Sequence, residues 1–387
     1  MSEGNETSDT GQETRDKEQV SSASSSNRVS RSTSPLLSRR VLIIGPSNIG
    51  DAILASYVVA TVHRRFPEAY CTLAVGHRAK TLFVDDPRIH ALIDVDLFRS
   101  AMGRLRLAWV LWRYRPQIVV DLRHTFYPLL LKPLTSWRYV RQPPKRVVHM
   151  QERHLWKLRR QAPSVGLHRT GGGGQDLPAD PRSELPLWVS GKDVAHVETL
   201  RRRWQLDETL PLVVICPGAR SHIKRWSAEG FARIADRLIA ERRAQVVFSG
   251  EPDEKPIIEE ILSLMTQGAH TAVGLTTVRQ LGVLMRGADL VITNDSASLH
   301  LASAFNVPTV AIFGPTDAKK YGPTSALRSV VRRKLFCAPC EQALCRFSHE
   351  CMRFVAASEV YQAATDLLDQ NALTETRGGK QGADESS

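Results

Sequence analysis

An aspartate, a lysine and a run of small hydroxyl residues are the side chains of this sequence whose type and setting suggest chemistry. The aspartate, Asp51, ends the run Gly45-Pro46-Ser47-Asn48-Ile49-Gly50-Asp51, whose glycines let the backbone turn tightly from a strand into a helix. A carboxylate at this place lies at the mouth of the expected ligand cleft, or it can simply cap the helix. The run has neither the Gly-Lys-Ser/Thr ending of a Walker loop nor the Gly-x-Gly-x-x-Gly pattern of dinucleotide sites.

The lysine lies in a segment rich in cations, Cys216-Pro217-Gly218-Ala219-Arg220-Ser221-His222-Ile223-Lys224-Arg225-Trp226. An apolar strand is expected to end at Cys216, so the cations follow the carboxyl end of a strand. They can hold a phosphate group, or they can be the solvated charges of a surface loop. Both interpretations remain open for this segment taken alone.

The hydroxyl residues belong to the run Thr293-Asn294-Asp295-Ser296-Ala297-Ser298-Leu299-His300, which ends a strand and opens a helix. The free N–H groups of a helix start form an anion site, and the hydroxyl groups of Ser296 and Ser298 can add donors. The alternative is an ordinary capped helix with a satisfied histidine. Gly314-Pro315-Thr316 ends the next strand, so two strand ends present small polar residues at one rim.

Strands that alternate with helices must position these motifs. Apolar runs predict the strands Val41–Ile44, Thr72–Val75, Leu92–Val95, Ile118–Leu122, Leu212–Cys216, Gln245–Ser249, Asp289–Thr293 and Thr309–Phe313. Helical patterns cover Ala52–Phe66, Lys192–Trp204, Ala228–Glu241, Glu254–Met265 and Ser296–Phe305. Such alternation predicts an α/β protein with parallel sheets, in which ligands bind at the carboxyl ends of the strands.

Composition divides the 387 residues into two folded parts and two tails. Residues 1–40 are rich in Ser, Glu and Thr and almost free of large apolar side chains, so we predict a disordered tail, and we interpret residues 371–387 in the same way. The loop-rich stretch Gly166 to Pro186 is either a surface excursion or the boundary between an N-terminal domain, residues 41–188, and a C-terminal domain, residues 189–370.

One block of the N-terminal domain carries the positive charge of the chain. The formal net charge is +12, and the segment Phe98 to Arg160 has 15 basic residues against two acidic ones, Asp121 and Glu152. Tryptophan and tyrosine residues are interleaved with the arginines. The block is either a solvated basic face or a surface that meets an anionic partner: a phosphorylated glycolipid, an anionic bilayer or nucleic acid.

Four cysteines form a cluster near the end of the C-terminal domain, in the segment 337–351. They follow the spacing C-x2-C-x4-C-x5-C, which fits a structural metal site, two disulfides or free thiols. These residues are Cys337, Cys340, Cys345 and Cys351. We assign the cluster no part in catalysis, and we interpret Cys71 and Cys216 as small core residues.

Taken in order, the motifs resemble the ADP-heptose:lipopolysaccharide heptosyltransferases of glycosyltransferase family 9. The pattern is Gly-Pro-Ser-x-x-Gly-Asp, then Pro-Gly-Ala followed by Lys-Arg-Trp, then Thr-Asn-Asp-Ser-x-x-x-His, then Phe-Gly-Pro-Thr, and it extends over residues 41–368. The resemblance implies a GT-B fold, in which two Rossmann-like domains face each other across a cleft. The acceptor would bind the N-terminal domain, and the nucleotide sugar would bind the C-terminal one.

The resemblance also implies a role for each matched residue. Asp51 would be the general base on the acceptor hydroxyl, and Lys224 would steady the diphosphate of the donor. Further substrate-binding positions would be Ser47, Gly50, Gly218, Arg225, Glu254, Asp295, Ser296, Ala297, Ser298 and His300. Ala297 stands where many family members have glycine. The scheme contains no metal and no other cofactor.

We therefore predict an inverting, metal-independent enzyme that moves heptose from ADP-heptose to the inner core of lipopolysaccharide. It would act in the cytoplasm, peripherally at the inner membrane, since the sequence has no secretory signal and no apolar run long enough to span a bilayer. Its partners would be the ADP-sugar donor and the anionic lipid A and core acceptor.

Three alternatives stay open at this point. The chain could use a different nucleotide sugar or acceptor, it could be a nucleotide-sugar epimerase, or it could be a catalytically silent relative that binds nucleic acid or another anion. The basic block argues against the epimerase, which has no large anionic acceptor. Asp51 and Lys224, the two residues that would carry the chemistry, argue against the silent protein.

Overall fold

The computed structural model describes residues 39–132, 137–162 and 185–384. Gly166 to Pro186, the stretch expected to divide the chain, falls almost wholly outside these ranges. Within them the backbone forms two separate sheets, and every strand pairing is parallel. The α/β class predicted from the alternating pattern is confirmed.

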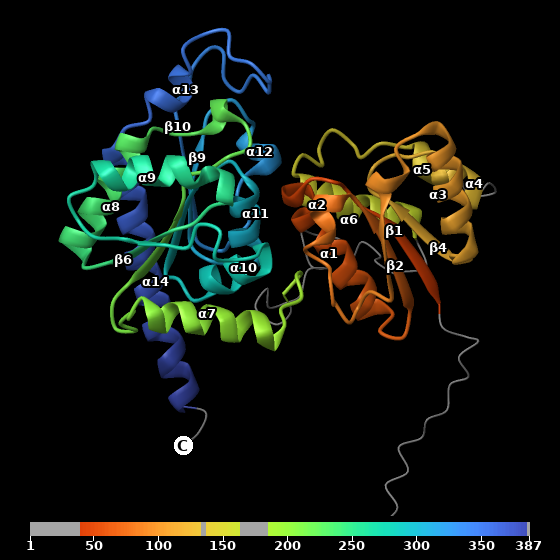
Figure 1. The fold of residues 1–387 in the computed structure, drawn as a ribbon, viewed down its shortest axis with the longest axis horizontal. Coiled ribbons are helices and arrows are strands. Elements are labelled where there is room, and N and C mark those ends of the chain that lie inside the picture. Colours follow the sequence, from red (N-terminus) through yellow and green to blue (C-terminus); the bar gives the residue numbers. More distant parts are fainter. Residues whose placement is uncertain (1–38, 133–136, 163–184, 385–387) are drawn as a thin grey trace, which may run out of the picture. The chain divides into compact units, whose positions relative to one another are not determined.

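The first sheet has the strand order β3-β2-β1-β4. Its strands β1, β2 and β4 are labelled in Figure 1. Its strands are β1 (Arg40–Ile44), β2 (Tyr70–Val75), β3 (Ala91–Asp94) and β4 (Ile118–Asp121). The helices of this part are α1 (Ile49–Arg65), α2 (His77–Lys80), α3 (Ala101–Arg113), α4 (Tyr127–Leu131), α5 (Trp137–Val140) and α6 (Met150–Gln161), with a 3-10 turn η1 (Val95–Phe98). Val41 to Ile44 and all of β4 are buried, as continuous apolar runs covered on both faces should be.

The second sheet has the order β10-β9-β8-β5-β6-β7. Its strands are β5 (Leu212–Cys216), β6 (Gln245–Phe248), β7 (His270–Thr271), β8 (Leu290–Asn294), β9 (Thr309–Phe313) and β10 (Arg328–Arg332). The helices are α7 (Gly191–Arg203), α8 (Ala228–Arg242), α9 (Lys255–Leu264), α10 (Val278–Arg286), α11 (Ala297–Ala304), α12 (Ala318–Tyr321), α13 (Glu350–Arg353) and α14 (Ala357–Asp384), with 3-10 turns η4 (His222–Lys224) and η5 (Pro252–Glu254). Every residue of β5, β8 and β9 is buried, so these strands form a rigid centre for the loops that follow them.

Two described elements, β1 and α14, overlap the stretches predicted as tails. Arg40 belongs to β1, where it pairs with Tyr70, so the first folded residues begin inside the stretch predicted as residues 1–40. At the other end, α14 continues to Asp384 and includes most of residues 371–387. A helix is extended more easily than it is nucleated, and the buried face of α14 at Val360, Tyr361 and Ala364 supplies the nucleus.

None of the helices in the described ranges has the length and hydropathy that crossing a bilayer requires.

Candidate active site

The second sheet brings three motif loops together, because the neighbouring strands β9, β8 and β5 are parallel and end at one edge. Pro217 and Gly218 follow β5, Asp295 and Ser296 follow β8, and Gly314 follows β9. Asn294, at the end of β8, holds two of these loops in place. Its amide donates to the carbonyl of Pro217 at 2.6 Å and accepts from the backbone N–H of Trp226 at 3.3 Å.

Lys224 and Asp295 form an ion pair at this edge. The Nζ atom of Lys224 lies 2.6 Å from Oδ2 of Asp295, and the lysine side chain is 31% exposed against 5% for the aspartate. The buried carboxylate therefore fixes a cation whose other N–H bonds are available to an anion. Arg225 donates from Nε to the carbonyl of Ala219 at 2.8 Å, which shapes the same loop.

The start of α11 lies beside this ion pair and has no side-chain cap. Its N-cap residue is Ser296, whose hydroxyl accepts no hydrogen bond from the first turn and lies 3.3 Å from Oγ1 of Thr293. The first-turn N–H groups, which begin at Ala297 and Ser298, thus have no capping side chain within the described part of the chain. This arrangement favours the anion-site interpretation over the capped helix.

His300 lies one turn further along α11 and holds α1 close to it. A Cβ atom placed on Gly50 would lie 3.1 Å from Cδ2 of His300 and 3.6 Å from Cα of Ala297. Gly50 therefore lets the two helix starts pack closely. Burial lowers the pKa of His300 to about 4, so this imidazole is neutral at pH 7.

Asp51 stands next to Gly50, in the first turn of α1. The N-cap of this helix is Asn48, and neither side chain caps the backbone; Nδ2 of Asn48 lies 3.4 Å from Oδ2 of Asp51. The helix-capping alternative for Asp51 is therefore wrong. Oδ1 of Asn48 accepts from Arg220 at 3.0 Å, which ties this turn to the cation-rich segment of the other sheet.

Tyr321, the last residue of α12, is a half-buried phenol whose pKa is affected by Asp51 and Asp295. The pKa of its phenol is raised chiefly by burial, and next by the negative charges of Asp51 and other carboxylates that include Asp295. Asp51 of α1 and Asp295, which follows β8, thus act on one side chain. The sequence placed these two residues in separate domains and gave no distance between them.

Glu254 and Gly218, two predicted substrate-binding positions, are also brought together. A Cβ atom on Gly218 would lie 2.0 Å from Oε1 of Glu254, so any other residue at position 218 would displace this carboxylate. Oε2 of Glu254 accepts from the backbone N–H of Glu251 at 2.9 Å. The pKa of Glu254 is raised, mainly by burial, which indicates a carboxylate shielded from bulk water.

Ser47 occupies the other rim of the site, where β1 and β2 end. A Cβ atom on Gly76 would lie 2.4 Å from its Oγ atom, and among the described residues this buried hydroxyl has no hydrogen-bond partner. The structure therefore places Ser47 in contact with the chain after β2. It shows no bond from Ser47 to Asp51.

A buried polar group at the end of β4 was not identified from the sequence. The Asp121 carboxylate accepts from the backbone N–H of Arg123 at 2.9 Å. The side-chain amide of Gln161 accepts from the backbone N–H of Asp121 at 2.7 Å and donates to the backbone carbonyl of Asp121 at 3.1 Å. Lys157 donates to the carbonyl of Leu122 at 2.5 Å, and burial lowers the pKa of this lysine to about 8. The signal was present, since Asp121 ends an apolar run and is one of the two acids of the basic block. Asn294, inside a quoted motif, was missed as well.

Comparison with known proteins decides the family of this chain. Residues 178–350 match the family model described as glycosyltransferase family 9 (heptosyltransferase). Over 358 residues the chain is 30% identical to a lipooligosaccharide heptosyltransferase 2 of Campylobacter jejuni, a match that covers 86% of this chain and 100% of that protein. The chain belongs to glycosyltransferase family 9. It is therefore a glycosyltransferase, as its motifs predicted.

Other family-9 proteins agree in sequence and in fold. The chain is 26% identical to the lipopolysaccharide heptosyltransferase 2 of Escherichia coli, over 87% of this chain and 97% of that protein. The solved structure of an E. coli ADP-heptose heptosyltransferase II has a TM-score of 0.64 at 24% identity, covering 86% of this chain and 99% of that one. A family-9 structure from Veillonella parvula has a TM-score of 0.70 at 20% identity, covering 86% and 98%. The predicted GT-B fold is confirmed.

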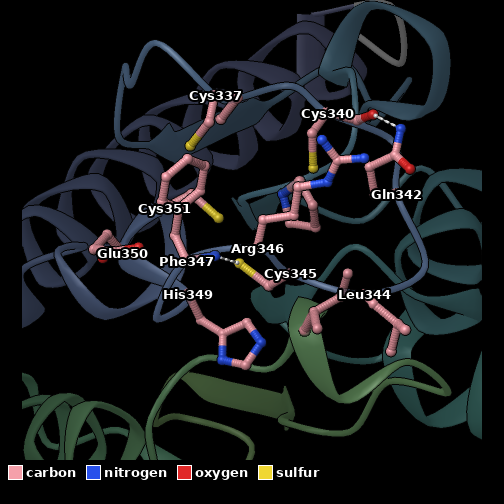
Figure 2. Close-up of a pocket in the computed structure, with 13 residues that line it drawn as sticks. Cys337, Cys340, Gln342, Leu344, Cys345, Arg346, Phe347, His349, Glu350 and Cys351 are labelled. Carbon is pink, nitrogen blue, oxygen red and sulfur yellow. Dashed lines mark hydrogen bonds between the residues drawn. The ribbon is translucent and has the colours of Figure 1, made fainter.

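The four clustered cysteines line one hollow together with Ile223 and His349 (Figure 2). The six cysteines of the chain are free thiols in the structure, and no group of three potential ligands in the described residues is arranged to hold a metal. The cluster packs against the loops that follow β5 and β9. The N–H groups of Cys340 and Glu341 donate to the carbonyl of Pro315 at 3.0 and 2.8 Å, and the ring of His349 meets that of His222 edge-on at 5.6 Å.

We expect the thiols to react in two classes. Cys337, Cys340 and Cys345 are half-buried, whereas burial raises the pKa values of Cys71 and Cys216 to about 12 and raises that of Cys351. An aromatic disulfide reagent should therefore modify the three half-buried thiols of the native protein quickly, and the others only after unfolding.

The same titration separates the three interpretations of the cluster. Unfolding without a reductant exposes all six thiols if they are free, and fewer if they form disulfides. A bound metal would instead protect the clustered thiols until a chelator is added.

Proposed function

We propose that this glycosyltransferase transfers heptose from ADP-heptose to the inner core of lipopolysaccharide, with inversion and without a catalytic metal. The names of its relatives support the substrate class, since they are lipopolysaccharide or lipooligosaccharide heptosyltransferases. One observation carries the proposal. The packing of Gly50 against His300 and Ala297 sets the carboxylate of Asp51 near the uncapped start of α11. Asp295, just before that helix, holds Lys224.

The acceptor side of the reaction falls to Asp51. Its carboxylate removes the proton of the acceptor hydroxyl as that oxygen bonds to the anomeric carbon, and the bond from this carbon to the diphosphate breaks. Attack opposite to the leaving group inverts the configuration. Such an in-line displacement needs a base and an anion site on opposite sides of the anomeric carbon, and in this proposal each sheet provides one of them.

The donor side needs positive charge where the diphosphate leaves. Lys224 and the N–H groups at the start of α11 supply it, and Asp295 holds the lysine in position. Ser296 and Ser298 add hydroxyl donors, while Glu254, seated over Gly218, accepts a hydrogen bond from the ribose. In this scheme neutral His300 keeps the two helix starts in contact and takes no proton.

The acceptor itself is a phosphorylated glycolipid, which matches the basic block of the first part of the chain. Its 15 basic residues between Phe98 and Arg160 give a long stretch of positive charge in the part of the chain that also contains Asp51. We propose that the protein meets this lipid at the inner face of the cytoplasmic membrane, as a peripheral protein of the cytoplasm.

Calorimetric titration with ADP, UDP and GDP tests the donor assignment first. We expect ADP to bind at least about tenfold more tightly than UDP or GDP, a difference of about 1.4 kcal/mol. Transfer from ADP-heptose to a core acceptor that lacks its heptose then tests the reaction. Preference for UDP or GDP would replace the sugar donor, and binding of none of them would contradict the donor site.

A further inference from the structure

Helix α3 has two apolar stripes instead of one. Leu107 and Leu111 are buried and face the core of the first sheet. A second set repeats at intervals of three, four and three residues and lies between 54% and 75% exposed: Met102, Leu105, Trp109 and Trp112. At 3.6 residues per turn these intervals place the second set along the opposite side of the helix from the first.

The neighbouring helix α4 extends this apolar surface. It packs against α3. Phe126 immediately precedes α4, and Leu129 and Leu130 belong to it. These three side chains are between 41% and 55% exposed. Leu97, in the turn before α3, is 76% exposed. We call the exposed apolar side chains of residues 97–130 the α3–α4 surface. A water-soluble protein rarely leaves so many large apolar side chains together in solvent unless they bind something.

Arginines surround the α3–α4 surface. The exposed ones between positions 97 and 131 are Arg99, Arg104, Arg106, Arg113, Arg115 and Arg123. The only acidic residue in that range is Asp121, which is buried, and Asp96 just before it lies 3.3 Å from Arg99. The guanidinium of Arg113 lies 4.9 Å from the ring centre of Trp109, which joins the cationic and the aromatic part of the surface.

We propose that the α3–α4 surface docks on an anionic lipid bilayer, with the side chains of Met102, Leu105, Trp109 and Trp112 inserted at the level of the headgroups. Tryptophan and flanking arginine residues are the side chains suited to that interface. Charge complementarity selects anionic lipid as the occupant, because arginines flank the whole surface. Nucleic acid would satisfy the arginines but would leave leucine and methionine in water. The proposal rests on the proposed function, and it identifies where the enzyme meets the membrane of its acceptor.

Vesicle flotation of the full-length protein tests this proposal. We expect binding to vesicles of phosphatidylcholine mixed with phosphatidylglycerol, weaker binding to phosphatidylcholine alone, and a decrease as salt is raised. The variant Trp109→Gln/Trp112→Gln should lose at least about tenfold in partition coefficient, since it removes two interfacial anchors. The variant Leu264→Gln/Leu275→Gln, which changes two exposed apolar residues of the other sheet's part, should float like the wild type.

A second readout changes two arginines and keeps the four apolar side chains of the stripe in place. Arg106→Gln/Arg113→Gln should reduce binding to the anionic vesicles several-fold and flatten its dependence on salt, while binding to neutral vesicles changes little. These side chains are exposed, so the variants should fold, which an unchanged unfolding midpoint would confirm.

The outcomes that overturn the docking surface differ from those that overturn the enzymatic proposal. Wild-type flotation by the Trp109→Gln/Trp112→Gln variant would remove the surface from membrane binding. Stronger binding to random-sequence DNA than to the anionic vesicles, lost in the arginine variant, would make nucleic acid the partner. Dimerisation of the wild type that the tryptophan variant abolishes would make a second copy the occupant. ADP binding and transfer to a short water-soluble acceptor should stay within about twofold in all these variants, because they lie outside the site.

Discussion

Asp51→Asn should reduce the rate of transfer by about 10² to 10⁴-fold, the usual contribution of a positioned general base, and leave ADP binding unchanged. The substitution keeps the shape of the side chain and removes its ability to accept the proton. The donor contacts that we propose come from the second sheet, whereas Asp51 belongs to α1 of the first. Initial rates with ADP-heptose and calorimetry with ADP measure the two properties separately.

The same variant should fold normally, which makes the result interpretable. Asp51 caps nothing, and its one described side-chain contact is the 3.4 Å approach of Asn48. Glu229→Gln is the matched control, since Glu229 is a carboxylate in the first turn of α8, outside the site. Each substitution removes a favourable helix-dipole interaction of about 0.3 to 1 kcal/mol. Turnover of Asp51→Asn within a few-fold of the wild type would eliminate Asp51 as the base.

The strands were the part of the fold that the sequence predicted best. β5 and β9 have the bounds expected of them, because an apolar run closed by Pro-Gly or Gly-Pro leaves little choice of end point. The helix α3 was not predicted. Its outer apolar stripe fills the positions that an amphipathic pattern reserves for polar residues, so the periodicity disappears. The exposed apolar stripe that removes the helical periodicity of α3 is also the observation on which its proposed function rests.

For the candidate site, the sequence suggested residue types but not the distances between them. Parallel pairing requires the motif loops after β5, β8 and β9 to meet at one edge, so the proximity of Lys224 and Asp295 follows from the strand order. The contact between α1 and α11 follows from no such rule. It depends on Gly50 being small enough to accept the ring of His300, a packing detail between residues 250 positions apart. The role of Asn294, which joins two loops through its amide, was not identified from the sequence, because that role also depends on packing.

Lys224→Met is the second change for which we expect a large effect. It should weaken donor binding by about tenfold or more and lower kcat by about 10² to 10³-fold, because the lysine would neutralise charge that develops on the leaving diphosphate. Titration with ADP and initial rates at saturating donor measure the two effects. Lys192→Ala, which removes an exposed lysine near the start of α7, serves as the control for loss of one positive charge.

Loss of activity in Lys224→Met has a structural explanation that must be separated from the chemical one. Asp295 is 5% exposed, and without its partner at 2.6 Å the buried carboxylate should cost about 1 to 3 kcal/mol of unfolding free energy. The double variant Lys224→Met/Asp295→Asn removes that unpaired charge, so we expect urea unfolding to show most of the stability regained. Its donor affinity should stay as low as that of the single variant, because the cation is still missing. Recovery of donor binding together with stability would instead show that Lys224 holds the loop and does not hold the diphosphate.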